Sequence, residues 1–231
     1  MIPLDYLVIA SHPDDAEIGL GGTISLLLSQ GARVGILDLT DGEPTPHGSP
    51  EIRDRETRAA SKVLGITWRG NLGLPNRSVE ADLGSRALLA EMLREVRPTT
   101  LFAPYWEDVH PDHVASSKLV DDARFWAKLT RSTLRGEPFY PRCTFYYLSI
   151  HLRVQPTANL VLDISDHIET KMEAVRCYHS QLIQGRDPAF PTVLDDIRDR
   201  ARYWGWTIGR GYGEPLISRE QIGLKSLEQL A

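Results

Sequence analysis

The chain has 231 residues, of which 42% are hydrophobic and 25% charged, and its net charge is -5 at neutral pH. This composition is ordinary for a globular protein, and the length suits one α/β domain with a full hydrophobic core. An acidic chain lacks the basic stripe that a nucleic-acid backbone requires, so we expect no nucleic-acid partner. No apolar run reaches the ~20 residues of a membrane span, and no leader pattern opens the chain. We therefore expect a cytoplasmic protein that makes no membrane contact.

Strand-like and helix-like stretches alternate from the start of the chain. Apolar runs predict strands, and helical spacing with capping residues predicts helices. The expected strands are 6–10, 33–39, 66–72 and 100–103, and the expected helices are 17–30, 51–64, 82–97 and from the end of the 104–111 loop to about 129. Beyond residue 140 we expect strands at 143–151 and 159–164, a helix at 165–181, a further helix, a glycine-rich turn at 209–213 and a tail. The alternation predicts an α/β fold, with a Rossmann-like, mostly parallel sheet covered by helices.

We expect one domain spanning residues 1–231. Its Rossmann-like core covers about residues 1–130, and a C-terminal α+β extension covers about residues 140–231. No linker composition separates the two parts.

The first chemical motif is His12-Pro13-Asp14-Asp15, directly after the first predicted strand. Open parallel sheets bind ligands just outside the carboxyl ends of their strands. Pro13 favours an extended His12 and a helix start, so His12 and Asp15 can converge as Zn²⁺ ligands. Asp14 must then point elsewhere and suits a general base beside a metal-bound water. Alternatively, the acidic residues only stabilise a helix N-terminus.

The second motif, His110-Pro111-Asp112-His113, follows the fourth predicted strand. His113 can complete a 2-His-1-carboxylate set that leaves a position open for water, as in catalytic zinc sites. His110 can stabilise an oxyanion or protonate a leaving amine, and Asp112 is predicted to orient the His110 ring. Coincidental helix caps are the alternative, but two such motifs beyond two strand ends argue against it.

Several other residues have competing interpretations. Gly19–Gly22 resembles part of a dinucleotide-binding phrase, but Ile24 replaces the third glycine and carboxylates occupy the helix N-terminus. Glu43 follows the second strand and either faces the site or belongs to a plain turn. Arg53 is either a substrate clamp or an i,i+3 partner of Glu56. A structural interpretation is favoured for His179, and for the remaining histidines that lack a partner motif: His47, His151 and His167.

Three segments, 10–23, 39–43 and 110–113, resemble the PIG-L/LmbE-like N-deacetylase family, and 178–181 and 211–215 are similar to it as well. The nearest group is the bacillithiol-pathway deacetylases, which act on N-acetylglucosaminyl malate. The resemblance implies one Zn²⁺ per chain and a compact homo-oligomer, often a hexamer. It implies these roles: His12, Asp15 and His113 as metal ligands, Asp14 as general base, His110 as oxyanion stabiliser or acid, and Arg53 as a substrate-binding residue.

Two positions depart from the patterns of related groups. Val109 stands where many malate-directed members carry arginine, and Asp108 stands where relatives in the mycothiol branch carry tyrosine.

We therefore expect a zinc-dependent hydrolase that removes an N-acetyl group from an N-acetylglucosamine conjugate, with N-acetylglucosaminyl malate as the leading substrate and Glu43 as a second candidate for substrate binding. A deacetylase of another N-acetylated sugar or small amide remains an alternative. The same ligand set also suits an Fe²⁺ oxygenase, although the neighbouring Asp14 favours hydrolysis. The more distant alternative is a binding module without catalysis.

Overall fold

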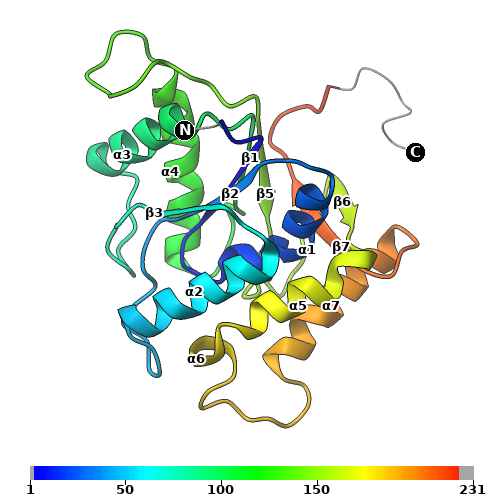
Figure 1. Ribbon diagram of the computed structural model, residues 1–231. Helices are drawn as coiled ribbons and strands as arrows, with labels where there is room; N and C mark the ends of the chain where they lie inside the picture. The colour runs from blue at the N-terminus through cyan, green and yellow to red at the C-terminus, as the bar shows by residue number, and fades with distance from the viewer. Residues whose placement is uncertain (1–2, 224–231) are drawn as a thin grey trace.

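A seven-stranded sheet with the strand order β3-β2-β1-β4-β5-β7-β6 forms the centre of the computed structural model, which describes residues 3–223 (Figure 1). The strands are β1 (Tyr6–Ala10), β2 (Val34–Asp38), β3 (Trp68–Asn71), β4 (Thr100–Pro104), β5 (Cys143–Tyr147), β6 (Leu160–Asp163) and β7 (Gly213–Ile217). Neighbouring strands from β3 to β5 pair in parallel, whereas β7 runs antiparallel to both β5 and β6.

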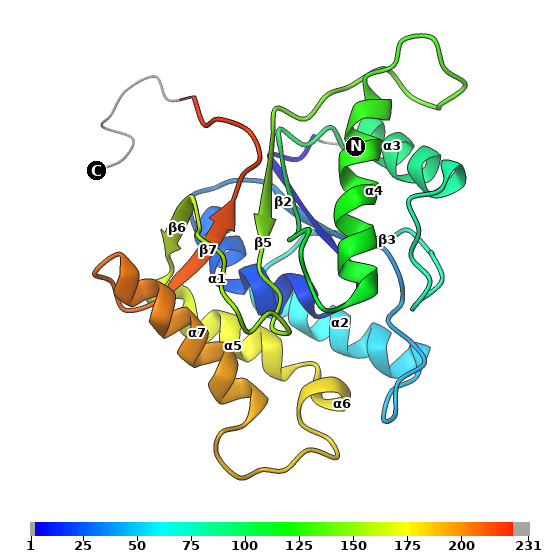
Figure 2. The same cartoon turned by 180° about the vertical axis from the view of Figure 1, so that it is seen from behind.

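Helices cover both faces of the sheet (Figures 1 and 2). They are α1 (Asp15–Ser29), α2 (Pro50–Leu64), α3 (Leu83–Val96), α4 (Pro111–Ala127), α5 (Ile168–Arg176), α6 (His179–Leu182) and α7 (Val193–Thr207), with a short 3-10 helix, η1 (Ser165–His167). The pair α3 and α4 packs on one face, and α1, α2 and α5 pack on the other. None of the helices in the described part of the chain is long and apolar enough to cross a membrane.

Strand β1 shows why this sequence forms a sheet that is covered on both sides. Leu7 and Ile9 belong to one buried hydrophobic cluster, and Val8 and Ala10 belong to the other. Since successive side chains of a strand point to opposite faces, an uninterrupted apolar run buries both faces at once. The parallel, helix-covered sheet predicted from the sequence is confirmed.

The strand order reverses between β1 and β4, which pair directly with each other. The chain leaves β1 toward β2 and leaves β4 toward β5, on opposite sides of this point. In open α/β sheets the loops at such a reversal diverge and leave a crevice for a ligand. Both histidine motifs directly follow these two strands, so the fold brings them to the same crevice.

The C-terminal part differs from the prediction in three places. The strand predicted at 143–151 ends at Tyr147, and the helix predicted at 165–181 is divided into η1, α5 and α6. Strand β7, where the sequence suggested a turn and a tail, was missed. Its Gly213 and Pro215 both disfavour strands. Pro215 is tolerated because the pairing of β7 with β5 covers only Leu216 and Ile217.

Candidate active site

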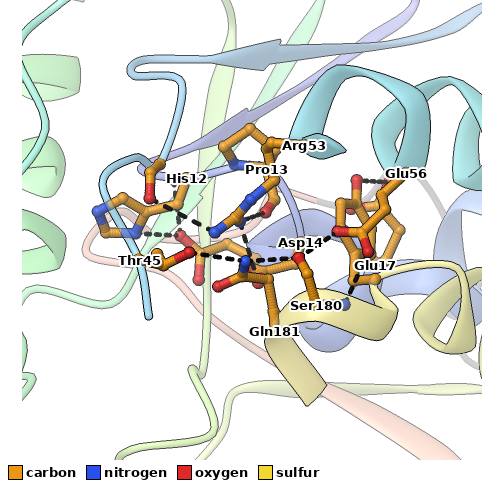
Figure 3. A network of polar contacts seen from close by, with 12 residues as sticks. His12, Pro13, Asp14, Glu17, Thr45, Arg53, Glu56, Ser180 and Gln181 are labelled. Carbon is orange, nitrogen blue, oxygen red and sulfur yellow. Dashed lines mark hydrogen bonds and ion pairs between the residues drawn. The ribbon is translucent and has the colours of Figure 1, made fainter. Parts of the chain in front are cut away.

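Asp14 immediately precedes α1 and has an unusual backbone conformation, with φ 122° and ψ -29°. A non-glycine residue in such a region costs about 1–3 kcal/mol and persists only where its surroundings hold it. Arg53 supplies that support, since its Nη1 donates to the carbonyl oxygen of Pro13 at 2.5 Å and to Oδ2 of Asp14 at 3.4 Å (Figure 3). The strained turn directs the Asp14 side chain into the crevice.

Three side chains predicted as metal ligands converge on one point. Oδ2 of Asp15 lies 3.2 Å from Nδ1 of His12 and 3.3 Å from Nε2 of His113. His113 is 1% exposed, and its Nε2 has no hydrogen-bond partner among residues 3–223. An unpaired imidazole nitrogen is costly to bury, and two imidazoles with a carboxylate form a common donor set for a divalent transition metal. These residues therefore fit a bound metal ion.

A carboxylate lies behind each of the two candidate metal-binding histidines, His113 and His12. Oδ2 of Asp108 is 3.0 Å from Nδ1 of His113, and Oδ2 of Asp112 is 3.2 Å from Nε2 of His12. Ser149 in turn donates to Asp108. Such carboxylates fix the orientation and tautomer of a metal-binding imidazole. The role of Asp108 was missed from the sequence, where this residue was noted only as a departure from a family pattern.

Among residues 3–223, the Asp112 carboxylate makes no hydrogen bond to the His110 ring that it was predicted to orient. His110 precedes α4, and its Nδ1 accepts the backbone N–H of Asp112 at 3.2 Å. The Asp112 carboxylate instead accepts the backbone N–H groups of Arg77 and Val79. His12, His110 and Asp112 also cluster closely enough to suggest a metal set. We favour the Asp15 set, because the Asp112 carboxylate is already engaged by these backbone groups.

His110 is arranged as a hydrogen-bond donor. Because its Nδ1 accepts a backbone N–H, a neutral ring carries its proton on Nε2. Burial lowers the pKa of His110, and the neighbouring His113 and His12 lower it further. The ring is therefore neutral near pH 7.

The two adjacent carboxyl groups have opposite pKa shifts. Burial raises the pKa of Asp14 to about 7, and the charge of Asp15 adds to this effect, while Arg53 and His12 oppose it. Burial also acts to raise the pKa of Asp15, but His113 and His12 outweigh it and hold that pKa well below its usual value. The Asp15 carboxyl thus stays ionised, as a metal ligand requires, while the Asp14 carboxyl titrates near neutrality, which suits a general base.

Of the two residues predicted to bind substrate, Arg53 lines the cleft and Glu43 does not. Arg53 lines the cleft but is only 4% exposed, and its Nε donates to Oε1 of Glu43 at 3.2 Å. Glu43 is also buried and accepts from Thr45 and Gln181. Glu56, the other proposed partner of Arg53, accepts from Ser180 instead (Figure 3). The geometry makes Glu43 a support for Arg53.

A cleft of about 1220 Å³ opens above the metal-ligand set. His12, Asp14, Asp15, His110 and His113 all line it, together with residues from α2, α6 and α7. His151, taken as structural from the sequence, also lines the cleft, and its ring centroid lies 5.8 Å from that of His110 and 5.9 Å from that of His113. The available signal was its place shortly after β5, whose carboxyl end lies at the same edge as that of β4.

The remaining histidines lie in other surroundings. Nδ1 of His167 is 2.9 Å from the hydroxyl of Ser25, and His179 is exposed at the start of α6. His47 packs next to Gly185. Val109 is 72% exposed at the edge of the cleft, so an arginine here would have reached its opening.

A cluster of two histidines and a carboxylate, with a second carboxylate beside it at the reversal point of a Rossmann-like sheet, defines a class of metal-dependent hydrolases. The family model described as PIG-L: GlcNAc-PI de-N-acetylase matches residues 7–124. The chain belongs to this family of N-deacetylases, which are amide hydrolases acting on carbon–nitrogen bonds other than peptide bonds.

Comparisons with individual proteins agree with this assignment. Diacetylchitobiose deacetylase of Thermococcus kodakarensis is 30% identical over 224 residues, which cover 90% of this chain and 80% of that protein. A probable N-acetyl-alpha-D-glucosaminyl L-malate deacetylase 2 of Bacillus subtilis is 29% identical over 189 residues, covering 76% of this chain and 82% of that protein. The crystal structure of the conserved protein TT1542 from Thermus thermophilus superimposes with a TM-score of 0.88 at 38% identity, covering 96% of this chain and 97% of that one.

Proposed function

We propose that this enzyme is a zinc-dependent deacetylase that removes the N-acetyl group from an N-acetylglucosamine conjugate, with N-acetylglucosaminyl malate of bacillithiol biosynthesis as its substrate. The observation that carries the proposal is the convergence of His12, Asp15 and His113 beside Asp14 at the floor of the large cleft. A Bacillus relative of similar length has a name that refers to this malate conjugate. The cleft volume exceeds what an acetamido group alone would fill and leaves room for a sugar and its aglycone.

The metal would be held by His12, Asp15 and His113 and, when bound, would supply Lewis acidity to the acetyl carbonyl and acidify water. Asp14 accepts a proton from the water that attacks the carbonyl carbon. Its pKa of about 7 suits this role, because a base with such a pKa can take up the proton and later return it.

His110 acts on the acetyl oxygen. Its Nε2 donates a hydrogen bond to this oxygen as negative charge develops there. As the carbon–nitrogen bond breaks, the proton held by Asp14 passes to the amine nitrogen, and acetate and the free amino sugar result. Asp108 and Asp112 keep the rings of His113 and His12 in place. Arg53 holds the turn that carries Asp14.

The first test is acetate release from N-acetylglucosaminyl malate and from N-acetylglucosamine, by purified protein with Zn²⁺ and with a chelator. We expect chelator-sensitive release with a strong preference for the malate conjugate. Release without preference would keep the deacetylase and reject the malate substrate. No release from either compound by a zinc-loaded protein would reject N-acetylglucosamine conjugates as substrates.

The metal and the assembly are tested separately. We propose Zn²⁺ rather than Fe²⁺, and elemental analysis of protein purified without added metal distinguishes the two ions. We also propose a homo-oligomer, with a hexamer as the leading form. Light scattering coupled to size exclusion measures its mass, and a monomer at micromolar concentration would reject this part of the proposal.

A further inference from the structure

Arg200 on α7 differs from Arg94 and Arg69, two other arginines that are sheltered from water. Arg94 donates to carbonyl oxygens such as those of Ala127 and Leu129, and Arg69 binds the carboxylates of Asp38 and Glu17. Such multiple bonding is the usual condition for placing a guanidinium away from water. These arginines therefore have evident structural roles.

Arg200 is half-buried, and among residues 3–223 its recorded hydrogen bond is a 3.3 Å contact from Nη2 to Oε1 of Gln155. No Asp or Glu in the described part of the chain forms an ion pair with it, whereas Arg198, two residues earlier, pairs with Glu169 at 2.7 Å. Burial lowers the pKa of Arg200, while the charges of Asp108 and Asp196 act in the opposite direction. Within the described part of the chain, Arg200 is therefore a half-buried cation without an ion-pair partner, an arrangement that is costly unless a ligand supplies one.

Arg200 lines the same cleft as the metal-ligand set. Its contact Gln155 is itself fixed, because the amide Nε2 of Gln155 donates to the carbonyl oxygen of Leu152. The guanidinium is therefore held from one side, and its other N–H groups have no hydrogen-bond partner among residues 3–223. A planar guanidinium with free donors is the side chain best suited to bind a carboxylate through two parallel hydrogen bonds.

Three further arginines, Arg77, Arg153 and Arg186, also line the cleft, but all three are exposed, so water and salt weaken their attraction for a carboxylate. Asp196 and Asp199 also line it, but both are exposed, so water and salt screen their repulsion of an anion. Val109, at the cleft edge, brings no charge. Arg53 is already occupied by Pro13 and Glu43.

We propose that Arg200, held by Gln155, is the specificity-determining residue that binds a carboxylate on the aglycone of the N-acetylated sugar. This inference rests on the proposed deacetylase function and names the residue that recognises the aglycone. It explains how an anionic conjugate is selected by a chain that has Val109 in place of an arginine. Arg200 acts in binding and takes no part in the bond-breaking step.

The test uses three substrates: N-acetylglucosaminyl malate, its uncharged dimethyl ester, and methyl N-acetylglucosaminide. We expect the zinc-loaded wild-type enzyme to prefer the diacid over the diester. Arg200→Gln should lower kcat/KM for the diacid by about 10- to 100-fold, the loss expected for a hydrogen bond between charged groups. Its kcat/KM for the two uncharged substrates should stay within about twofold of the wild-type value, because the bond-breaking residues are intact.

Arg202→Gln is the matched control. Arg202 lies on the same helix but is exposed and donates to the carbonyl oxygens of Arg210 and Gly211. This variant should keep the wild-type preference. Arg200→Lys, which keeps the charge but loses the planar pair of donors, should recover only part of the diacid activity. Calorimetric binding of the product glucosaminyl malate gives a second readout that needs no turnover, and Arg200→Gln should weaken it by a similar factor.

The outcomes separate the two proposals. Efficient hydrolysis of all three substrates without preference for the diacid would overturn the role of Arg200 and leave the deacetylase intact. An Arg200→Gln variant that keeps both the preference and the product affinity would do the same. A wild-type preference for a phosphate-bearing conjugate over the malate diacid would replace the carboxylate by a phosphate and overturn the proposal as stated. No acetate release from any conjugate would overturn the proposed function and this inference with it.

Discussion

Oδ2 of Asp108 lies 3.0 Å from Nδ1 of His113, on the side of the ring opposite the nitrogen that faces Asp15. The His113 side chain and the Asp108 side chain are both almost completely buried. This carboxylate therefore determines which nitrogen of His113 is free to bind a metal ion, and it does so from a position outside the ligand set.

Removing the Asp108 charge should weaken metal binding. Asp108→Asn is expected to lower zinc affinity by about 10- to 100-fold, because the amide holds the His113 ring less firmly and adds no basicity. Competition with a chromophoric chelator measures this affinity. Glu107→Gln removes an exposed neighbouring carboxylate and serves as the control. Unchanged zinc affinity in Asp108→Asn would show that the contact does not support the metal.

Replacing the base should separate catalysis from metal binding. Asp14→Asn keeps the side-chain shape but cannot accept a proton, so kcat is expected to fall by about 10²- to 10⁴-fold. Zinc content should stay near that of the wild type, since Asp14 lies beside the ligand set and is not part of it. Acetate release and elemental analysis of the same preparation check both statements. Normal turnover by this variant would contradict the assignment of Asp14.

Arg53 offers a way to tell a positioning residue from a substrate clamp. Arg53→Lys keeps the charge but cannot reach Pro13, Gly42 and Glu43 together. We expect a lower kcat with a KM within about threefold of the wild-type value, because the strained Asp14 turn loses its support. A raised KM with normal kcat would instead restore the substrate-binding role predicted from the sequence. Thr57→Ser, on the same helix, is a mild control.

A buried ion pair joins α5 to β7, and its carboxylate also binds the backbone of α1. Lys171 donates to Glu214, and Glu214 also accepts the backbone N–H groups of Gly22 and Thr23. Lys171→Met should destabilise the protein by about 3–5 kcal/mol, because it leaves the Glu214 charge buried without a partner. Urea unfolding measures this change. In the double variant Lys171→Met/Glu214→Gln, which removes both charges, we expect part of the stability to return.

The cap of α3 should make stability depend on pH in the acid range. Hydrogen bonds from the backbone and side chain of Ser85 lower the pKa of Asp82 below its usual value. A carboxyl whose pKa is depressed by folding stabilises the protein above its unfolded pKa, and this contribution disappears as the pH falls through the folded pKa. Asp82→Asn keeps an acceptor without a titrating group. Its stability deficit relative to wild type should therefore shrink between about pH 5 and pH 3.

Urea midpoints at several pH values check this expectation. Glu80→Gln removes an exposed carboxylate outside the helix and should show no such trend. A constant difference between wild type and Asp82→Asn across the acid range would contradict it.

The sequence predicted those parts of the fold and site that depend on local signals. Mostly apolar runs identified β1, β2 and β4, and the His-Pro-Asp pattern identified both segments that meet between β1 and β4. What failed depends on contacts between distant segments. The direction of the Asp112 side chain is set by backbone N–H groups of the segment before α3, 33 or more residues away.

His151 and Arg200 illustrate the same limit. Neither lies in a motif, and each reaches the cleft only because β5 joins β4 and α7 folds back beside the opening. The distance in sequence between these residues and the candidate metal ligands does not predict that they meet. They are brought together by the C-terminal half of the sheet. Glu43 shows the opposite case. The sequence predicted that it follows the second strand near the site, but its side chain bonds to Thr45 and Arg53 and does not line the cleft.

The position of β7 has a consequence for synthesis on the ribosome. Because β7 inserts between β5 and β6, β6 has no strand to pair with until residues 213–217 have left the exit tunnel. Glu214 of that strand also holds the backbone of α1, the helix that begins with Asp15. A nascent chain that already contains His12, Asp15 and His113 therefore still lacks the strand that holds α1 in place, and these side chains become fixed only after residues 213–217 have been synthesised.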